Sequence, residues 1–208
     1  MTHNLSSKLE NQINGAVKIV KAGGIIAFPT DTIYGLGANV YDDKAINRIY
    51  EVKQRPRHMP LPILLSDESQ ISIVAASVSQ IAQLLIKSFW PGGLTLVLSR
   101  AASFKGSVLL GGNTVAVRIP NHIVPVTIIR EAGVPLVGTS ANISNKPGAL
   151  TAEEVEVQLG NDVDIIVDGG KCPGGLESTV IDLTGETPEI LRRGAVSEEQ
   201  IARVCKNI

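Results

Sequence analysis

The sequence predicts an α/β fold, with a mixed sheet flanked by helices, on three observations. Short apolar runs typical of buried strands alternate along the chain with amphipathic segments at helical spacing. Hydrophobic residues make up 44% of the 208 residues, while aromatic residues make up only 3%. No internal repeat, linker or low-complexity segment interrupts the pattern. We therefore expect one domain over residues 1–208, built around an aliphatic core.

Composition argues against several classes of protein. A formal net charge of -1 does not favour a generally basic protein that coats nucleic acid. The 2 cysteines, Cys172 and Cys205, are too few for a disulfide framework and lack metal-ligand spacing, and the 3 histidines are scattered. We expect no zinc site, no histidine triad, no metal-ligating residues and no tightly bound cofactor. A polar N-terminus without a signal peptide, and no apolar run of membrane-spanning length, predict a soluble cytoplasmic protein.

The N-terminal half predicts four helices and three strands. Ser7 and Glu10 have the spacing of a capping box, and apolar residues at helical spacing continue to Val20 before two glycines. A helix that contains Ile46, Ile49 and Tyr50 must end before the proline at position 56. The other elements expected here are strands at 25–28, 61–65 and 94–98 and helices at 67–76 and 80–89.

The C-terminal half continues the alternation. Pro125 suits the first turn of a helix that runs to about Ala132. Thr151 and Ser197, each followed three residues later by Glu or Gln, predict the starts of two further helices. We expect strands at 114–119, 134–138, 163–167, 178–183 and 190–192, and a glycine-rich loop at 169–175.

The segment 29–39, P-T-D-T-I-Y-G-L-G-A-N, is the first candidate site. It follows the apolar run 25–28, and strand ends in α/β folds are where ligands bind. Gly35 and Gly37 allow close backbone approach. A polar turn between two strands remains the alternative at this point.

Basic residues form a second candidate. Lys53, Arg55, Arg57 and His58 cluster at the end of a predicted helix, which suits a phosphate site or cations that offset the helix dipole. Arg118 stands inside an apolar strand pattern, where a charged side chain needs a partner. That partner is either a ligand carboxylate or a protein carboxylate in a structural salt bridge.

Hydroxyl and amide groups form the third candidate. The run 138–142, G-T-S-A-N, follows a predicted strand and suits phosphate or ribose oxygens, or a simple turn. Glu177, Ser178 and Thr179 repeat this pattern after the glycine-rich loop, and Arg192 adds a late basic group. The sequence contains neither a Walker A motif nor G-x-G-x-x-G after the first strand. With no arranged nucleophile, substrate positioning and charge neutralisation would supply catalysis.

Six motifs occur together and in order: P-T-D-T-I-Y-G-L-G-A-N at 29–39, K-Q-R-P at 53–56, W-P-G-G-L-T at 90–95, T-V-A-V-R-I-P at 114–120, T-S-A-N-I-S at 139–144 and E-S-T-V-I-D at 177–182. In these the chain resembles the YrdC/Sua5/TsaC family of L-threonylcarbamoyladenylate synthases, in its short form without the additional C-terminal domain. The resemblance implies a twisted open mixed sheet around a large, positively charged concave cavity.

The resemblance also implies a nucleotidyltransferase reaction. L-threonine, bicarbonate or CO2 and ATP, usually with Mg2+, would give threonylcarbamoyl-AMP and pyrophosphate. The product would serve N6-threonylcarbamoyladenosine formation at position 37 of tRNA through downstream threonylcarbamoyl-transferase proteins, and tRNA itself is a possible partner.

Individual residues fall at the family's functional positions. The resemblance implies catalytic roles for Lys53, Arg55 and Arg118. On the threonine side it implies Thr32, Leu64, Arg118, Gly138 and Ser178, and on the ATP side Lys53, Arg55, Met59, Thr114, Ser140, Asn142, Gly148 and Arg192. Met59 and Leu64 depart from the residues common in the family, which is harmless if the backbone makes those contacts.

Two other functions remain open on the sequence. One is an RNA- or ribosome-binding module of this fold without synthase activity, but the chain has few aromatic residues and its basic residues lie in compact motifs. The other is a relative that uses a different amino or carbamoyl substrate. The K-x-R-P and S-A-N motifs favour the enzyme.

Overall fold

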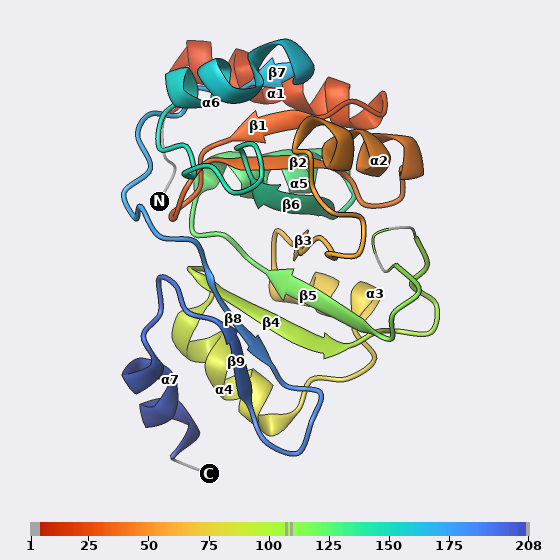
Figure 1. Cartoon of the computed structure of the whole chain (residues 1–208), viewed down its shortest axis with the longest axis vertical. Coiled ribbons are helices and arrows are strands. Elements are labelled where there is room, and N and C mark those ends of the chain that lie inside the picture. The colour runs from red at the N-terminus through yellow and green to blue at the C-terminus, as the bar shows by residue number, and fades with distance from the viewer. Residues whose placement is uncertain (1–4, 107, 109, 207–208) are drawn as a thin grey trace.

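The computed structural model describes residues 5–106, 108 and 110–206, which form a mixed sheet flanked by helices (Figure 1). The helices are α1 (Ser7–Lys21), α2 (Asp43–Val52), α3 (Ile71–Val74), α4 (Gln80–Phe89), α5 (Ile123–Ala132), α6 (Ala152–Leu159) and α7 (Glu198–Cys205), with short 3-10 turns at Glu68–Gln70 and Gly160–Asp162. The strands are β1 (Ile26–Phe28), β2 (Gly35–Asn39), β3 (Ile63–Leu64), β4 (Leu94–Ser99), β5 (Thr114–Arg118), β6 (Leu136–Ser140), β7 (Ile165–Ile166), β8 (Thr179–Asp182) and β9 (Glu189–Arg192).

The strands form one sheet in the order β7-β1-β2-β6-β3-β5-β4-β8-β9. Strand β1 pairs in parallel with β7, β3 with β5, and β4 with β8, while the other neighbours are antiparallel. The predicted α/β class and mixed sheet are therefore confirmed. The central strands come from distant parts of the chain, so the sheet brings the separate sequence motifs together.

The short strand β1 is buried on both faces. Successive side chains in a strand point to opposite faces, and here Ile26 and Phe28 join a core with α1 and α5, while Ile25 and Ala27 join the larger core. Aliphatic residues dominate both cores. This explains why residues 25–28 form an unbroken apolar run rather than an alternating one.

Helix starts confirm most of the capping predictions. The Thr151 hydroxyl accepts from the Glu154 amide, and Ser197 and Gln200 form the reciprocal capping box of α7. The box predicted at Ser7 is wrong, because the hydroxyl of Ser6 accepts from the Leu9 amide and Leu9 has no carboxylate to return the bond.

Two strand assignments also differ from prediction. Residues Gly35–Asn39, expected as part of a strand-end motif, form strand β2, paired with β1 and β6. A Cβ on Gly35 or on Gly37 would lie 2.9 Å from the phenyl ring of Phe28, which is too close, so glycine is favoured at both positions. The strand predicted at 134–138 runs instead from Leu136 to Ser140, and it carries Thr139 and Ser140 within the sheet.

Candidate functional site

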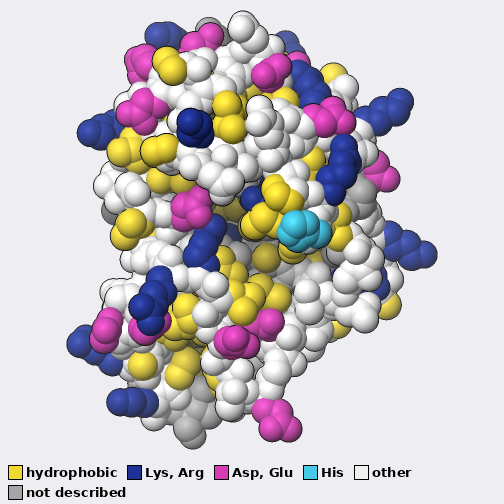
Figure 2. All heavy atoms as spheres, viewed as in Figure 1, with side chains coloured by type: hydrophobic (Ala, Val, Ile, Leu, Met, Phe, Trp, Pro, Cys, Tyr) yellow, Lys and Arg dark blue, Asp and Glu magenta, His cyan; other side chains and the backbone are white. Residues whose placement is uncertain are grey.

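A cleft of about 990 Å³ opens over the middle of the sheet. Its walls come from the β1–β2 turn, the segment after α2, strands β3, β4, β5 and β6, the loop after β6, and β8 and β9. Figure 2 shows this face hollowed at mid-height, with Lys and Arg side chains beside the hollow. The sheet order thus assembles motifs that lie more than a hundred residues apart in the sequence.

Nearly all the predicted site residues line this cleft. They are Thr32, Lys53, Arg55, Met59, Leu64, Arg118, Gly138, Ser140, Asn142, Gly148, Ser178 and Arg192. Thr114 is exposed at the start of β5 and is not among the described lining residues. No ligand tests its predicted nucleotide contact, which stays a prediction.

Lys53 lies at the C-cap of α2 and is 1% exposed. Its ammonium donates to the backbone oxygens of Ser140 and Asn142 and, at 3.2 Å, to Oδ1 of Asn142. Because an ammonium has three N–H donors, these acceptors engage them all. Burial, together with the nearby Arg55, lowers the pKa of Lys53 to about 8. In this structure Lys53 therefore holds the S-A-N segment, rather than offering its charge freely to a phosphate.

Arg55 and Met59 belong to one ordered segment. Nε and Nη2 of Arg55 donate to the backbone oxygens of Met59 and Pro60, at 3.3 and 3.1 Å. The hydroxyl of Tyr50 also donates to the Met59 oxygen, at 2.8 Å. Met59 is 41% exposed, and its backbone oxygen makes the hydrogen bonds that order this wall. Arg55 keeps further N–H groups for a ligand.

Arg118 occupies the buried part of the cleft wall, with a side chain that is 8% exposed. Its guanidinium donates to three acceptors: Gly92 O at 2.9 Å, Thr32 Oγ1 at 3.1 Å and Asp31 Oδ1 at 2.7 Å. Of the two partners left open by the sequence, the structure contains the protein carboxylate. A guanidinium has five N–H donors, so the described contacts leave two for a ligand.

The Ser178 and Arg192 side chains meet in another part of the cleft wall. Nη2 of Arg192 donates to Ser178 O at 2.8 Å and to Ser178 Oγ at 3.0 Å, and Nη1 forms an ion pair with Glu177. The hydroxyl of Thr95 lies 2.8 Å from Ser178 Oγ. Sequence reasoning did not assign roles to Thr95 or Glu177. The signal for Thr95 was a polar residue within the apolar run L-T-L-V-L of β4.

Two glycines of the predicted site allow close packing. A Cβ on Gly138 would lie 2.5 Å from the side chain of Leu64, and a Cβ on Gly148 would lie 2.7 Å from Ile33. Leu64 therefore covers Gly138 from the neighbouring strand β3. Any larger residue at position 138 would force Leu64 to move and, because Leu64 lines the cleft, would change the shape of the predicted threonine side.

The cleft is basic. Its described lining residues include Lys53, Arg55, Arg118, Lys146 and Arg192, against the single carboxylate of Glu177. Within the described residues, no three His, Cys, Asp or Glu side chains gather so as to hold a metal ion. The arrangement suits an anionic ligand that carries several charges, together with a smaller carboxylate at Arg118.

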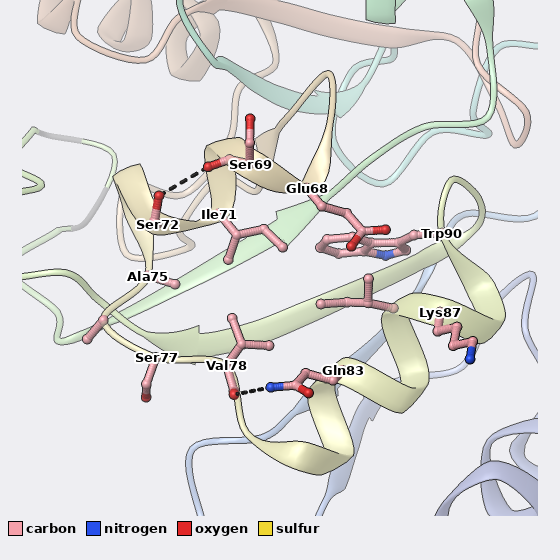
Figure 3. Close-up of a pocket in the computed structure, with 12 residues that line it drawn as sticks. Glu68, Ser69, Ile71, Ser72, Ala75, Ser77, Val78, Gln83, Lys87 and Trp90 are labelled. Carbon is pink, nitrogen blue, oxygen red and sulfur yellow. Dashed lines mark hydrogen bonds between the residues drawn. The ribbon is translucent and has the colours of Figure 1, made fainter.

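A second, smaller cavity of about 770 Å³ lies among residues of α3, α4 and the turn before α3 (Figure 3). Figure 3 shows Glu68 beside the ring of Trp90, and Gln83 beside Val78. The side-chain amide of Gln83 donates to Val78 O at 3.3 Å. None of the predicted site residues lines this cavity. It has no basic cluster like that of the cleft, so the cleft is the candidate site.

The family model Sua5_yciO_yrdC, described as "Telomere recombination", matches residues 18–194. The chain belongs to the Sua5/YciO/YrdC family. The match includes all of the strands described above. The family resemblance predicted from the six motifs is therefore confirmed.

Curated relatives carry informative names. The chain is 39% identical over 206 residues to threonylcarbamoyl-AMP synthase of Pyrococcus abyssi. The alignment covers 99% of this chain and 61% of the relative. It is 40% identical over 205 residues to the protein of the same name from Bacillus subtilis, covering 98% and 59%. The chain thus spans about three fifths of the length of these two relatives. A relative from Haemophilus influenzae, 32% identical, is named only as an uncharacterized protein, with 89% of this chain and 90% of the relative covered.

Solved structures match the fold closely. The crystal structure of P. abyssi Sua5 complexed with L-threonine has a TM-score of 0.90 and 40% identity, covering 94% of this chain and 58% of that one. Escherichia coli YciO has a TM-score of 0.83 and 30% identity, covering 92% and 93%. These matches confirm the predicted family fold.

The helices of the described residues are all too short or too polar to cross a membrane.

Proposed function

We propose that the chain binds L-threonine and ATP in the cleft and, with bicarbonate or CO2, forms threonylcarbamoyl-AMP and pyrophosphate. The observation that carries this proposal is the guanidinium of Arg118, on which the described contacts leave two N–H donors, in a cleft lined by further basic side chains. The names of the relatives, and the crystal structure of P. abyssi Sua5 with L-threonine, support the choice of substrate.

The chemistry follows from the identities of the products. The threonine amine adds to CO2 and loses a proton, which gives a carbamate. A carbamate oxygen then bonds to the α-phosphorus of ATP, and the bond from that phosphorus to the pyrophosphate oxygen breaks. Negative charge moves to the leaving pyrophosphate, where Arg55 and Arg192 would offset it. Arg118 would hold the threonine carboxylate by its planar fork.

Mg2+ fits this cleft as part of the nucleotide substrate. Nucleotide enzymes hold Mg2+ through one or two carboxylates and the substrate phosphates. Glu177 is the one carboxylate among the described lining residues, so most ligands of the ion would come from ATP and water. The ion would supply further neutralisation of the phosphate charge.

Pyrophosphate release tests the proposal. We expect release to require both threonine and bicarbonate, and to be much lower with serine, with alanine or without an amino acid. Equal release under these conditions would disprove the assignment of threonine and favour a relative with another amino or carbamoyl substrate. The product is expected to pass to threonylcarbamoyl-transferase proteins that modify tRNA, in the cytoplasm.

RNA binding provides a second test. Because the chain carries a net charge of -1, binding to bare tRNA should be weak and should fall steeply with salt, as phosphate contacts do. Tight, sequence-specific binding of tRNA that ATP and threonine do not change would favour an RNA-binding module instead. Filter binding at two salt concentrations, with and without both substrates, distinguishes these outcomes.

A further inference from the structure

Asp31 is the charged residue of the first motif to which sequence reasoning gave no role. It lies in the turn between β1 and β2, and its side chain is 16% exposed. Oδ1 accepts from Nη2 of Arg118 at 2.7 Å and from the backbone N–H of Asn121 at 2.9 Å. Among the described residues, Arg118 and Thr32 line the cleft, whereas Asp31 does not. Arg118 therefore lies between Asp31 and the cleft.

Three acceptors fix the direction of the Arg118 guanidinium. Gly92 O and Thr32 Oγ1 are neutral, and Asp31 is the charged one. Thr32 is itself held, because its hydroxyl lies 2.9 Å from Thr30 Oγ1, which donates to Ile33 O. The plane of the guanidinium is thus set before any ligand arrives, which lowers the cost of ordering it on binding.

Charge is the second property that Asp31 controls. Burial lowers the pKa of Arg118, and the carboxylate of Asp31 raises it. Without an anion, a buried guanidinium is costly, so Asp31 stabilises the free protein. The same carboxylate makes the pair neutral, and a ligand carboxylate then gains less from Arg118 than it would from an uncompensated cation.

We propose that Asp31 is a positioning residue that sets both the direction and the net charge of Arg118 toward the carboxylate of the substrate. This inference rests on the proposed function only because it takes threonine as the substrate that carries the carboxylate. The two effects oppose each other. The acceptor oxygen of Asp31 favours ligand binding by holding the fork in place, and its negative charge disfavours ligand binding by competing for the same cation.

Two substitutions separate the effects. Asp31→Asn keeps an oxygen that can accept from Arg118 and Asn121 but removes the charge, so threonine should bind at least threefold more tightly. Asp31→Ala removes both, so threonine should bind at least tenfold more weakly. An unreactive ATP analogue should bind both variants within twofold of the unsubstituted protein. Calorimetric titration measures all these affinities, with circular dichroism as the folding check.

Asp164 is the matched control. It also accepts from an arginine, Arg48 at 2.6 Å, and from a backbone N–H, that of Ile25 at 2.8 Å, but it does not line the cleft. Asp164→Asn and Asp164→Ala should lower the melting temperature and leave threonine affinity unchanged. A purely structural role for Asp31 would make its variants behave in the same way.

The outcomes decide the proposal without ambiguity. Weaker or unchanged threonine binding by Asp31→Asn overturns the proposal. If Asp31→Ala does not fold, the threonine affinity of Asp31→Asn is sufficient to test it. If the unsubstituted protein binds another amino acid instead of threonine, the proposed function fails. The affinities of the Asp31 and Asp164 variants are then measured with that amino acid, and they test the role of Asp31 separately. If it binds no carboxylate ligand, both proposals fail.

Discussion

Two arginines that line the cleft, Arg118 and Arg192, each pair with a carboxylate, and the two pairs differ mainly in their exposure. The Arg118–Asp31 pair has side chains that are 8% and 16% exposed, and its arginine has further bonds to Gly92 and Thr32. The Arg192–Glu177 pair has side chains that are 42% and 40% exposed, and its arginine also donates to Ser178 O and Ser178 Oγ. Arginine Nη donates to a carboxylate oxygen in both pairs, so the chemistry is similar and the environment differs.

The difference indicates which part of the cleft is formed in advance. Breaking a buried pair leaves an uncompensated charge and costs several kcal/mol, on the order of 3–5. An exposed pair contributes about 0–1 kcal/mol, so a phosphate can replace Glu177 at Arg192 at little cost. We infer that the Arg118 wall keeps its structure when ligands bind, and that the Arg192 wall exchanges partners.

Replacing Arg118 with alanine should have the largest effect. If the fork holds the threonine carboxylate, the loss is on the order of 2–5 kcal/mol of threonine binding, because the partner charge is left unpaired. Binding of an unreactive ATP analogue should stay nearly intact. Calorimetric titration of both ligands measures this, with circular dichroism to confirm folding, since Asp31 would lose its partner too.

Arg192→Ala is the comparison for that variant. The substitution removes the arginine of the exposed pair, so it should weaken binding of the ATP analogue more than binding of threonine. Normal threonine binding by a folded Arg118→Ala variant would show that Arg118 is only a structural partner of Asp31.

Arg55→Ala should have the next largest effect, and on the nucleotide. A hydrogen bond to a charged group contributes about 1.5–3 kcal/mol, so ATP binding should weaken about tenfold or more. The reaction should also slow, because charge moves to pyrophosphate in the transition state. Arg55→Lys keeps the charge but not the two bonds to Met59 O and Pro60 O. If Arg55→Lys behaves as Arg55→Ala, the order of the 56–60 segment matters more than charge.

The pKa of Lys53, about 8, predicts a dependence of nucleotide binding on pH. Below pH 8 the ammonium donates to all three of its acceptors, and above it the neutral amine has only two N–H donors. ATP affinity should therefore fall between pH 7 and 9, on the order of tenfold, because the S-A-N segment on the proposed nucleotide side is then held by one hydrogen bond fewer and a positive charge near the phosphates is lost. The Lys53→Met variant should bind ATP weakly, and its ATP affinity should show no pH dependence that arises from residue 53.

This loss of affinity can be distinguished from unfolding. The pKa of Lys53 is lowered from 10.5 in the folded chain, so between pH 8 and 10.5 the unfolded chain binds more protons than the folded one at this residue. By linkage, the contribution of Lys53 to folding stability then rises with pH. A melting temperature that falls over pH 7–9 in parallel with ATP affinity, and does so equally in Lys53→Met, would contradict the assignment to Lys53.

Much of the fold was predictable from local pattern. Helix α4 and the capping box at Ser197 have signals within a few residues, and both are confirmed. Strand β2 was missed because G-L-G-A-N lacks the β-branched residues that mark strands. Its glycines are favoured by the ring of Phe28, a contact between neighbouring strands that composition does not show. The β6 shift likewise reflects pairing with β2 rather than local preference.

The sequence predicted most of the candidate residues that line the cleft but not their partners within the protein, and their roles toward ligands stay predictions. The buried Arg118 was expected to need an anion, and the sequence could not choose between a ligand and a protein carboxylate. The acceptors of Lys53 include backbone oxygens, and because every residue carries a carbonyl, no sequence pattern marks them. The placement of Asp31 behind Arg118 depends on the β1–β2 turn meeting β5, which is a matter of topology.

The smallest expected effect comes from Glu177→Gln, which tests the exposed pair. The substitution keeps a side chain that can accept from Arg192 but removes the one negative charge among the described cleft-lining residues. Phosphates would no longer be repelled by Glu177, so an ATP analogue should bind about threefold more tightly without divalent cations, within the 0–1 kcal/mol typical of exposed charges. The gain should shrink as salt is raised, since exposed charges are screened.

Glu198→Gln is the matched control for Glu177→Gln, because Glu198 pairs with Arg193 on the surface and does not line the cleft. It should leave nucleotide affinity unchanged. Titrations at two salt concentrations, with and without Mg2+, complete the test. Weaker binding of the metal-free analogue by Glu177→Gln would mean that Glu177 holds Arg192 in place for the phosphate. The exposed pair would then be formed in advance like the buried one, and the contrast between the two walls would not hold.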